Sequence, residues 1–205
     1  MNYILFKNKM FDLICFSIDQ VYALDPGFDR NNLSRWISKR LLIRLRQGWF
    51  TFPEFRSKPD YALYFANRMY RPSYISLHSA LSFYGIIPEA VVQITSVTTL
   101  KTTSFSNSIG EYSYNTIKKE LMFGYDVKSM PDGRALQIAL PEKAMLDLLY
   151  IFPEYRSAKD MEELRLDEDF LHDQMNMDLF HEFLLHFRNK SLEKRVRKLY
   201  STYGL

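Results

Sequence analysis

Cysteine is nearly absent from this chain. Cys15 is the only one among 205 residues, so no internal disulfide can form and a zinc site made of several cysteines is excluded. Because Cys15 lies in the apolar run LICF, a buried and unreactive thiol is a better prediction than a nucleophile. A chain without disulfides fits a reducing compartment, and we expect a cytoplasmic protein.

Long hydrophobic runs and the common catalytic motifs are missing as well. The first apolar run, YILF, is too short for a signal-peptide core and is followed by Lys7 and Lys9. No stretch approaches the roughly 18 apolar residues of a membrane span, and no P-loop, G-x-S-x-G or G-x-G-x-x-G motif occurs. The four histidines show none of the spacings of zinc motifs. We therefore expect a soluble protein without membrane contact, cofactor or metal.

Glycine and proline are also scarce, at seven and eight residues, which argues against long flexible linkers. Hydrophobic residues make up 47% of the chain and charged residues 25%, an ordinary globular composition. Tyrosine and phenylalanine are abundant, at 14 and 16 residues, and indicate an aromatic core. The length of 205 residues allows one large domain or two small ones.

Charge is distributed unevenly along the chain. Residues 1–58 hold ten basic residues (Lys and Arg) against five acidic ones (Asp and Glu). Residues 59–157 hold nine basic and nine acidic residues, and residues 158–205 hold eight basic and ten acidic ones. The net charge of the whole chain is +3. The positive excess at the N-terminus predicts a polyanionic partner for that part of the chain alone. An acidic stretch, 159–187, precedes a basic one, 188–198; the two could pair within the fold or across subunits, or both could be solvated.

The first 58 residues contain two helix signals separated by a turn. Ser17 and Gln20 have the spacing of a capping box, which predicts a helix over 18–24. The run DPGF, residues 25–28, indicates a turn, and Asp29 is placed to cap a second helix. The buried stripe predicted for this second helix consists of Leu33, Trp36, Ile37 and Leu41.

A basic hairpin is predicted after the second helix. Apolar residues alternate with arginines over 43–46, which is typical of a half-exposed strand. Gln47 and Gly48 favour a tight turn, and 49–52 returns as a second strand. Helix, turn, helix and basic hairpin, in this order, predict a winged helix-turn-helix domain over residues 1–58.

This order predicts double-stranded DNA as the partner of the first domain. In a helix-turn-helix the second helix enters the major groove and turns its outer face to the base edges. Asn31 and Arg35 can make bidentate contacts to adenine and guanine, while arginines of the hairpin meet phosphate or the minor groove. The alternative is a protein-interaction winged helix whose basic face is only solvated. The predicted DNA-binding residues are Arg30, Asn31, Ser34, Arg35, Ser38, Lys39, Arg44, Arg46 and Gln47.

The remaining residues, 59–205, predict an α+β domain. A helix that includes Tyr61 and Met69 is stopped by Arg71–Pro72, and another helix is predicted between a Ser76 cap and Gly85. Segments of alternating apolar residues follow and predict successive strands joined by short turns, hence an antiparallel sheet flanked by helices. These segments are 91–99, 110–117, 121–127 and 134–140.

Three amphipathic helices are predicted to complete the chain. Pro141 is placed at the first helical position of one of them. Asp178 and Ser191 are placed to cap the other two.

Two groups of polar residues could carry catalysis. His78 stands among serines, but neighbours on a helix point about 100° apart and no third orienting group is evident, so a helix-surface histidine is the better interpretation. The run DVK, residues 126–128, could hold a divalent metal together with Glu111, as in a metal-dependent nuclease. That triplet is common by chance, and we favour an exposed strand end with Asp126 and Lys128 as ordinary surface residues.

Six motifs follow one another from about Leu41 to Tyr150. They read RLRQGWF, ANRMYRPSYISLHSALSFYGIIPE, ITSVTT, GEYSY, LMFGY and LPEKAMLDLLY. Together, and in this order, they resemble the AbiEi-type antitoxins of bacterial abortive-infection toxin–antitoxin systems. The run RPSYISLHSALSFYGIIPE is the strongest single match.

The resemblance implies an N-terminal winged helix that binds operator DNA and represses the antitoxin's own operon, with two copies on inverted repeats. It implies a C-terminal domain, 59–205, that counters a nucleotidyltransferase-like toxin without necessarily binding it. The chain would then be no enzyme. A plain transcription regulator without a toxin is the alternative, and a metal-dependent nuclease is the less favoured one. We interpret residues 68–89 as the hinge between the domains, and any function of Arg68, Arg71 or His78 as binding.

Overall fold

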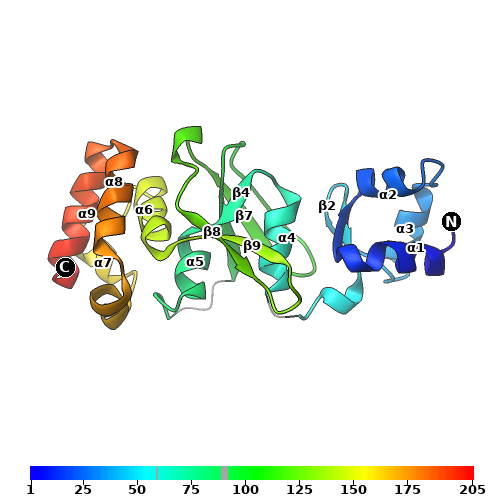
Figure 1. Ribbon diagram of the computed structural model, residues 1–205, viewed down its shortest axis with the longest axis horizontal. Helices are drawn as coiled ribbons and strands as arrows, with labels where there is room; N and C mark the ends of the chain where they lie inside the picture. The colour runs from blue at the N-terminus through cyan, green and yellow to red at the C-terminus, as the bar shows by residue number, and fades with distance from the viewer. Residues whose placement is uncertain (59, 89–91) are drawn as a thin grey trace.

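The computed structural model describes residues 1–58, 60–88 and 92–205 (Figure 1). The chain is elongated: the N-terminal segment, residues 1–58, lies at one end, a six-stranded sheet lies in the middle, and the C-terminal helices lie at the other end (Figure 1). The predicted domain boundary falls at Pro59, which is outside the described residues. No described helix has the length and apolar character that crossing a membrane requires.

The N-terminal segment combines three helices with a three-stranded antiparallel sheet in the order β1–β3–β2. Its second helix confirms the prediction: the Ser17 hydroxyl accepts from the Gln20 N–H at 3.2 Å, and the Gln20 side chain accepts from the Ser17 N–H at 2.9 Å. The elements are α1 (Tyr3–Met10), β1 (Cys15–Ser17), α2 (Ile18–Leu24), α3 (Asn31–Ser38), β2 (Ile43–Arg46) and β3 (Trp49–Thr51).

Two elements of this segment were not predicted from the sequence, namely α1 and β1. Helix α1 has little amphipathic pattern, since it exposes Ile4 and Leu5 and buries only Phe6 and Met10. Its place is decided by packing, because the Phe6 ring lies 4.7 Å from Trp36 and contacts the rings of Phe16, Phe28 and Phe52. Burial of Trp36 on α3 confirms its predicted place in the core.

The start of α3 differs by one residue from the prediction. Arg30 occupies the N-cap position, and Asp29 acts from one residue earlier, accepting from the Asn31 N–H at 2.9 Å. The carboxylate still satisfies a free backbone donor at the helix start. Cys15 is buried, and burial raises the pKa of its thiol to about 12, in keeping with the predicted unreactive cysteine.

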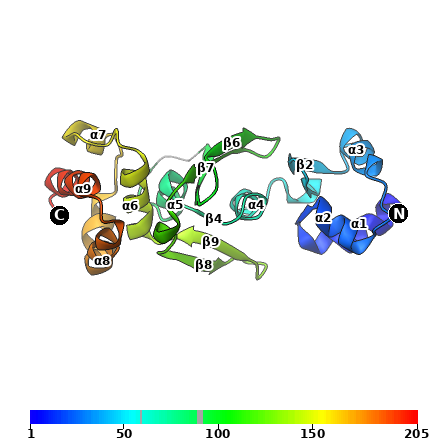
Figure 2. The same cartoon turned by 90° about the horizontal axis from the view of Figure 1, so that it is seen from above.

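The rest of the chain is a mixed α+β arrangement. Its sheet has the order β6–β7–β5–β4–β9–β8, with β6 and β8 at opposite edges (Figure 2). The elements are α4 (Tyr61–Met69), β4 (Ser73–Ile75), α5 (Leu77–Phe83), β5 (Gln93–Thr98), β6 (Thr103–Ser106), β7 (Glu111–Thr116), β8 (Tyr125–Ser129), β9 (Ala135–Ala139), α6 (Pro141–Ile151), α7 (Ala158–Glu162), α8 (Met177–Phe187) and α9 (Lys190–Tyr203).

The predicted antiparallel sheet is wrong in part, because the sheet is mixed. Strands β4 and β5, β6 and β7, and β8 and β9 pair antiparallel, whereas β5 pairs parallel with β7 and β4 pairs parallel with β9. The prediction assumed that each strand pairs with the next one in sequence. Instead β7 inserts between β5 and β6, and β9 lies beside β4, so strands distant in sequence become neighbours.

The interpretation of residues 68–89 as a hinge is also wrong. Ser73, Tyr74 and Ile75 form β4, a fully buried strand in the interior of the sheet between β5 and β9. Helix α5 follows and ends at Gly85 as predicted. The Gly85 N–H donates to Ser82 O at 3.0 Å, and its left-handed φ of 74° suits glycine. Glu89 and Val91, which the predicted segments also included, lie outside the described residues.

Three predicted element starts are shifted. The segment 121–127 begins with a 3-10 turn, Lys119–Leu121, and its strand β8 starts only at Tyr125. Helices α8 and α9 are capped by Asn176 and Asn189 rather than by Asp178 and Ser191. Each asparagine accepts from the N–H three residues later, so each helix starts two residues earlier than predicted.

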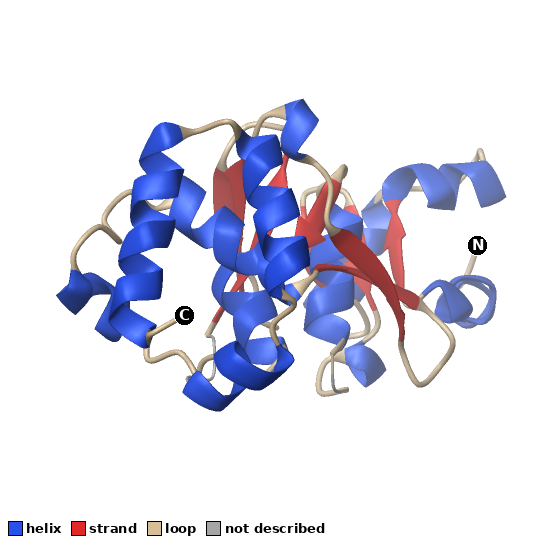
Figure 3. Ribbon diagram, turned by 60° about the vertical axis from the view of Figure 1, so that its left-hand side comes forward, coloured by secondary structure: helices blue, strands red, loops and turns tan. Residues whose placement is uncertain are grey.

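Helix α6 links the sheet to the C-terminal helices. It begins at Pro141 as predicted and packs against α5 on one side and against α8 and α9 on the other (Figure 3). The acidic stretch meets α9 through Tyr203, whose hydroxyl donates to Met161 O at 2.8 Å and accepts from the Leu166 N–H at 3.2 Å. Helix α7 of the acidic stretch thus packs on α9, the helix that also carries the basic stretch, and these contacts leave open whether the opposite charges pair.

Candidate nucleic-acid interface

Helix α3 presents one polar face to solvent. Leu33 and Trp36 are buried against the aromatic core, which leaves Asn31, Ser34 and Arg35 exposed on the opposite side. Ser38 and Lys39, at the end of the helix, are exposed as well. Six of the nine predicted residues thus lie on or beside this one exposed helix. They are Arg30, Asn31, Ser34, Arg35, Ser38 and Lys39.

Arg35 is held loosely on this face. Its guanidinium hydrogen-bonds the Asn32 side chain and lies 3.8 Å from the Asp29 carboxylate. Because the Arg35 and Asp29 side chains are 65% and 54% exposed, this ion pair is weak and solvent-screened. A base or a phosphate could take over the guanidinium at small cost. Ser38 donates to Ser34 O at 3.0 Å, so it adds little bulk to the helix surface.

The β2–β3 hairpin brings further predicted residues beside α3. A cleft of about 440 Å³ separates the helix from the hairpin and is lined by Arg30 and Ser34 from one side and by Arg44 and Gln47 from the other. The hairpin turn is anchored to α2, because Gly48 O accepts from the Ile18 N–H at 2.8 Å. Gly48 has a φ of 78°, which a glycine adopts without strain. Polar side chains of the helix and of the hairpin therefore face one common cleft, whose other lining residues are Leu33, Gly48 and Phe50.

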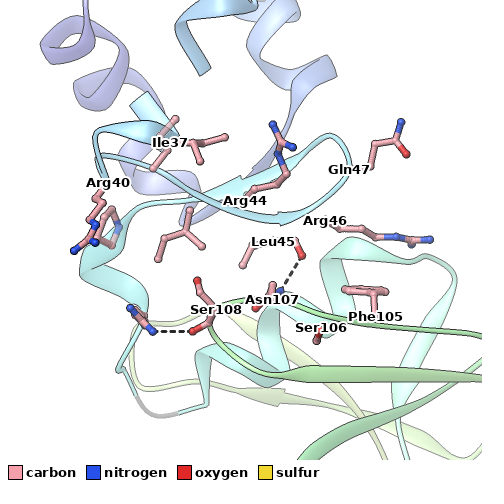
Figure 4. A pocket seen from close by; sticks show the side chains of 14 residues that line it. Ile37, Arg40, Arg44, Leu45, Arg46, Gln47, Phe105, Ser106, Asn107 and Ser108 are labelled. Atoms are coloured by element: carbon pink, nitrogen blue, oxygen red, sulfur yellow. Dashed lines mark hydrogen bonds between the residues drawn. The ribbon is translucent and has the colours of Figure 1, made fainter. Parts of the chain in front are cut away.

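Arg46 lies elsewhere than the alternating pattern predicted. The pairing register shifts between Arg44 and Arg46, and this irregularity turns Arg46 toward the C-terminal sheet (Figure 4). Its guanidinium carbon lies 4.5 Å from the ring centroid of Tyr70 and 4.9 Å from that of Phe105. One of its N–H groups donates to Met69 O at 3.4 Å. Arg46 thus joins the two segments of the chain, and of the two hairpin arginines Arg44 is the one that shares the exposed surface with α3.

The residues of the nuclease alternative are not brought together. Glu111 lies on β7 and Asp126 on β8, and three strands, β5, β4 and β9, separate them. At about 4.8 Å per strand the two strands are about 19 Å apart, too far for a shared metal ion. Asp126 pairs instead with Lys128 at 3.0 Å, and that hydrogen bond lowers the pKa of the carboxyl. Within the described residues no group of three potential ligands could hold a metal ion.

The serines near His78 have partners in the fold. Ser76 donates to Asp147 at 2.8 Å and therefore does not cap α5 with its side chain. Ser79 accepts from the Thr95 N–H at 2.8 Å, which ties α5 to β5. His78 Nε2 lies 3.2 Å from the Tyr155 hydroxyl. These contacts give both serines a structural role beside β4 and β5.

A buried polar cluster escaped the sequence analysis. Asp147 on α6 accepts from the hydroxyls of Tyr74 and Ser76, each at 2.8 Å, and forms an ion pair with Lys143. Lys143 also donates to the Tyr74 hydroxyl at 2.9 Å. Burial raises the pKa of Asp147 and lowers that of Lys143. The only signal in the sequence is a Lys and an Asp four residues apart on an otherwise apolar helix face.

No protein-family model matches the chain, and no curated protein matches it significantly.

Proposed function

We propose that residues 1–58 form a winged helix-turn-helix that binds double-stranded DNA, with α3 as the recognition helix and the β2–β3 hairpin as the wing. The observation that carries the proposal is the common cleft of α3 and the hairpin, which gathers Arg30, Ser34, Arg44 and Gln47. The order α1, β1, α2, α3, β2, β3 supports it, since the hairpin directly follows the helix that exposes its polar face.

The side chains on this surface suit the two tasks of DNA recognition. Asn31 and Arg35 are exposed on α3, and their amide and guanidinium groups can read adenine and guanine edges in the major groove. Arg44 on the hairpin and Arg30 before the helix are placed to meet phosphates on either side. The basic excess of residues 1–58, ten Lys and Arg against five Asp and Glu, supplies the long-range attraction.

We further propose that the chain is an AbiEi-type antitoxin that represses its own operon, on the support of the six motifs between Leu41 and Tyr150. Its C-terminal segment would counter a nucleotidyltransferase-like toxin, and two copies would occupy inverted repeats of the operator. A plain winged-helix regulator without a toxin is the second candidate, because the DNA-binding surface alone supports it equally well.

The DNA-binding proposal predicts that the double variant Arg35→Gln, Arg44→Gln binds DNA about 10- to 100-fold more weakly than the wild type, since a base contact and a phosphate contact are both lost. Fluorescence anisotropy with duplexes tiled over the DNA upstream of the chain's own gene measures this. Arg46 is a poor choice for the test because its change would also disturb the Tyr70 and Phe105 contacts.

The matched control is Lys9→Gln, which removes an exposed positive charge from α1 in the same segment. We expect it to bind nearly as well as the wild type. Wild-type affinity of the double variant, with an unchanged dependence on salt, would show that α3 and the hairpin do not contact DNA.

The antitoxin proposal predicts that this chain restores growth when it is co-expressed with the nucleotidyltransferase-like protein of the neighbouring gene. The Arg35→Gln, Arg44→Gln variant should rescue as well as the wild type, because the two functions are assigned to different segments. A colony count with and without each variant measures it. Rescue by neither form, or a neighbouring gene of another kind, would leave the plain regulator as the better description.

A further inference from the structure

A second basic groove lies on the other side of the β2–β3 hairpin. Strand β2 is the edge strand of the N-terminal sheet, and its free edge faces the turn between β6 and β7 of the C-terminal sheet (Figure 4). The groove between them has a volume of about 680 Å³. Its walls therefore come from both segments of the chain.

The walls are tied together by direct hydrogen bonds. Asn107 in the β6–β7 turn donates to Leu45 O of β2 at 2.8 Å, and Arg56 donates to Ser108 O at 2.9 Å (Figure 4). The stacking of Arg46 on Tyr70 and Phe105 adds a third connection. These bonds hold the β6–β7 turn at a set position beside the hairpin.

The groove carries charge of one sign only. Four arginines line it, Arg40, Arg44, Arg46 and Arg56, and none of its lining residues is acidic. Within the part of the chain that the structure describes, no carboxylate forms an ion pair with any of the four. Like charges gathered without a counter-charge repel one another, and an anion in the groove would relieve that repulsion. Guanidinium groups bind the oxygens of phosphates in a well-matched bidentate geometry.

The groove is continuous with the proposed DNA-binding surface. Arg44 and Gln47 line both this groove and the cleft beside α3. Positively charged side chains thus follow one path from α3 across the hairpin to Arg56 and the β6–β7 turn. A duplex read by α3 would continue along this path, whereas a small anion would not need it.

We propose that the groove holds the sugar-phosphate backbone of the duplex that α3 reads, so that the β6–β7 turn of the C-terminal segment is part of the DNA-binding surface. Arg40 and Arg56 contact phosphates, and the exposed Ser106 hydroxyl provides a further donor. This inference rests on the proposed function. In addition, the C-terminal segment lengthens the bound stretch of DNA beyond the half-site that a lone winged helix would cover.

The test uses the full chain with the double variant Arg40→Gln, Arg56→Gln, in which two exposed arginines are replaced. Arg56 also donates to Ser108 O, but loss of that hydrogen bond alone would weaken binding without making the salt dependence less steep. On a duplex of about 30 base pairs we expect the double variant to bind about 5- to 30-fold more weakly than the wild type. The plot of log K against log salt should be less steep by about 2, because two phosphate contacts are lost.

The control is the double variant Lys190→Gln, Lys194→Gln, which removes two exposed charges from α9 at the far end of the molecule (Figure 1). Its salt slope should equal that of the wild type. Urea unfolding of all variants checks that each is folded.

Each remaining outcome decides between the proposals. If Arg35→Gln, Arg44→Gln weakens binding while Arg40→Gln, Arg56→Gln changes neither affinity nor slope, the groove does not hold DNA and the proposed function still stands. If neither variant weakens binding, both proposals are wrong. If a single-stranded oligonucleotide binds through Arg40 and Arg56 while duplex binding ignores them, the groove takes single strands and the duplex inference is overturned.

Discussion

Replacing Asp147 with alanine is expected to lower the free energy of unfolding by about 3–5 kcal/mol, more than any other single change to a charged residue considered for this chain. Asp147 and Lys143 are both fully buried, with no exposed side-chain surface. Without the carboxylate, the Lys143 ammonium remains in the interior without its counter-ion. The hydroxyls of Tyr74 and Ser76 also lose the acceptor that they share.

The surroundings of Lys143 offer only partial compensation. Its ammonium lies 5.5 Å from the ring centroid of Tyr74 and 5.0 Å from those of Phe123 and Phe187. Ring faces attract a cation, but they provide no lone pair to accept its N–H groups. Since a domain is stabilised by only about 5–15 kcal/mol in total, the variant is expected to lose a large share of its free energy of unfolding.

Urea unfolding at neutral pH, followed by circular dichroism, measures the loss. Asp126→Ala is the matched control: the same substitution on an exposed strand, where the pair with Lys128 is half exposed, should leave the free energy of unfolding nearly unchanged. Equal effects at the two positions would mean that the buried cluster adds nothing specific to stability.

The double variant Lys143→Met, Asp147→Leu separates the cost of a lone charge from the loss of the pair itself. Removal of both charges leaves no buried ion, and burial already disfavours the charged form of each group. We expect the double variant to lose less free energy of unfolding than either single change. A loss equal to the sum of the two single losses would contradict this account.

Replacing Gly124 with alanine is expected to lower the free energy of unfolding by about 2–5 kcal/mol. Gly124 has a φ of 67°, where an L-residue costs about 1–2 kcal/mol. An added Cβ would also stand 2.9 Å from a ring carbon of Phe183 and 3.0 Å from Cγ of Lys143. The overlap adds about 1–3 kcal/mol, because neither neighbour is free to move.

The neighbours are constrained by the same buried cluster. The Lys143 ammonium is bound to Asp147 and Tyr74, so its stem cannot swing away from Gly124. The Phe183 ring packs edge-on against Phe123 at a centroid distance of 5.3 Å. Gly124 thus allows β8 to begin next to α6 and α8, and its carbonyl accepts from the Leu140 N–H at 2.9 Å.

Gly133→Ala is the matched control for this substitution. Gly133 has a similar φ of 79°, but nothing lies within 4 Å of an added Cβ. Its change should therefore cost only the backbone strain, about 1 kcal/mol. Thermal unfolding of both variants measures the difference, and equal losses would show that contact with Phe183 and Lys143 is unimportant.

Several features depend on hydrogen bonds between residues close in sequence, and these were predicted correctly. The capping box of Ser17 and Gln20 joins residues three apart, and the α5 end at Gly85 closes within six residues, since the Ile86 N–H donates to Leu81 O at 2.8 Å. Pro141 begins α6 because its ring has the helical φ before any contact forms. The exposed face of α3 follows from helical spacing alone.

The same local rules leave near-equivalent choices unresolved. Asn176 and Asp178 are both good caps, as are Asn189 and Ser191, and the start of each helix depends on which turn packs onto α6. The alternating pattern of β2 placed Arg44 and Arg46 on one side. The register shift that separates them is set by pairing with β3 and by the Tyr70 and Phe105 rings.

The sequence by itself determined the class of fold, the helices and strands with strong periodicity, and the basic character of residues 1–58. Only the tertiary structure decided the strand order, the interior place of β4, and the groove between β2 and the β6–β7 turn. It also decided the buried cluster, in which Tyr74 and Asp147 stand 73 residues apart. The physical reason is that helix periodicity and caps involve neighbours in the chain, whereas strand pairing and buried polar contacts join residues that meet only after the whole chain has folded.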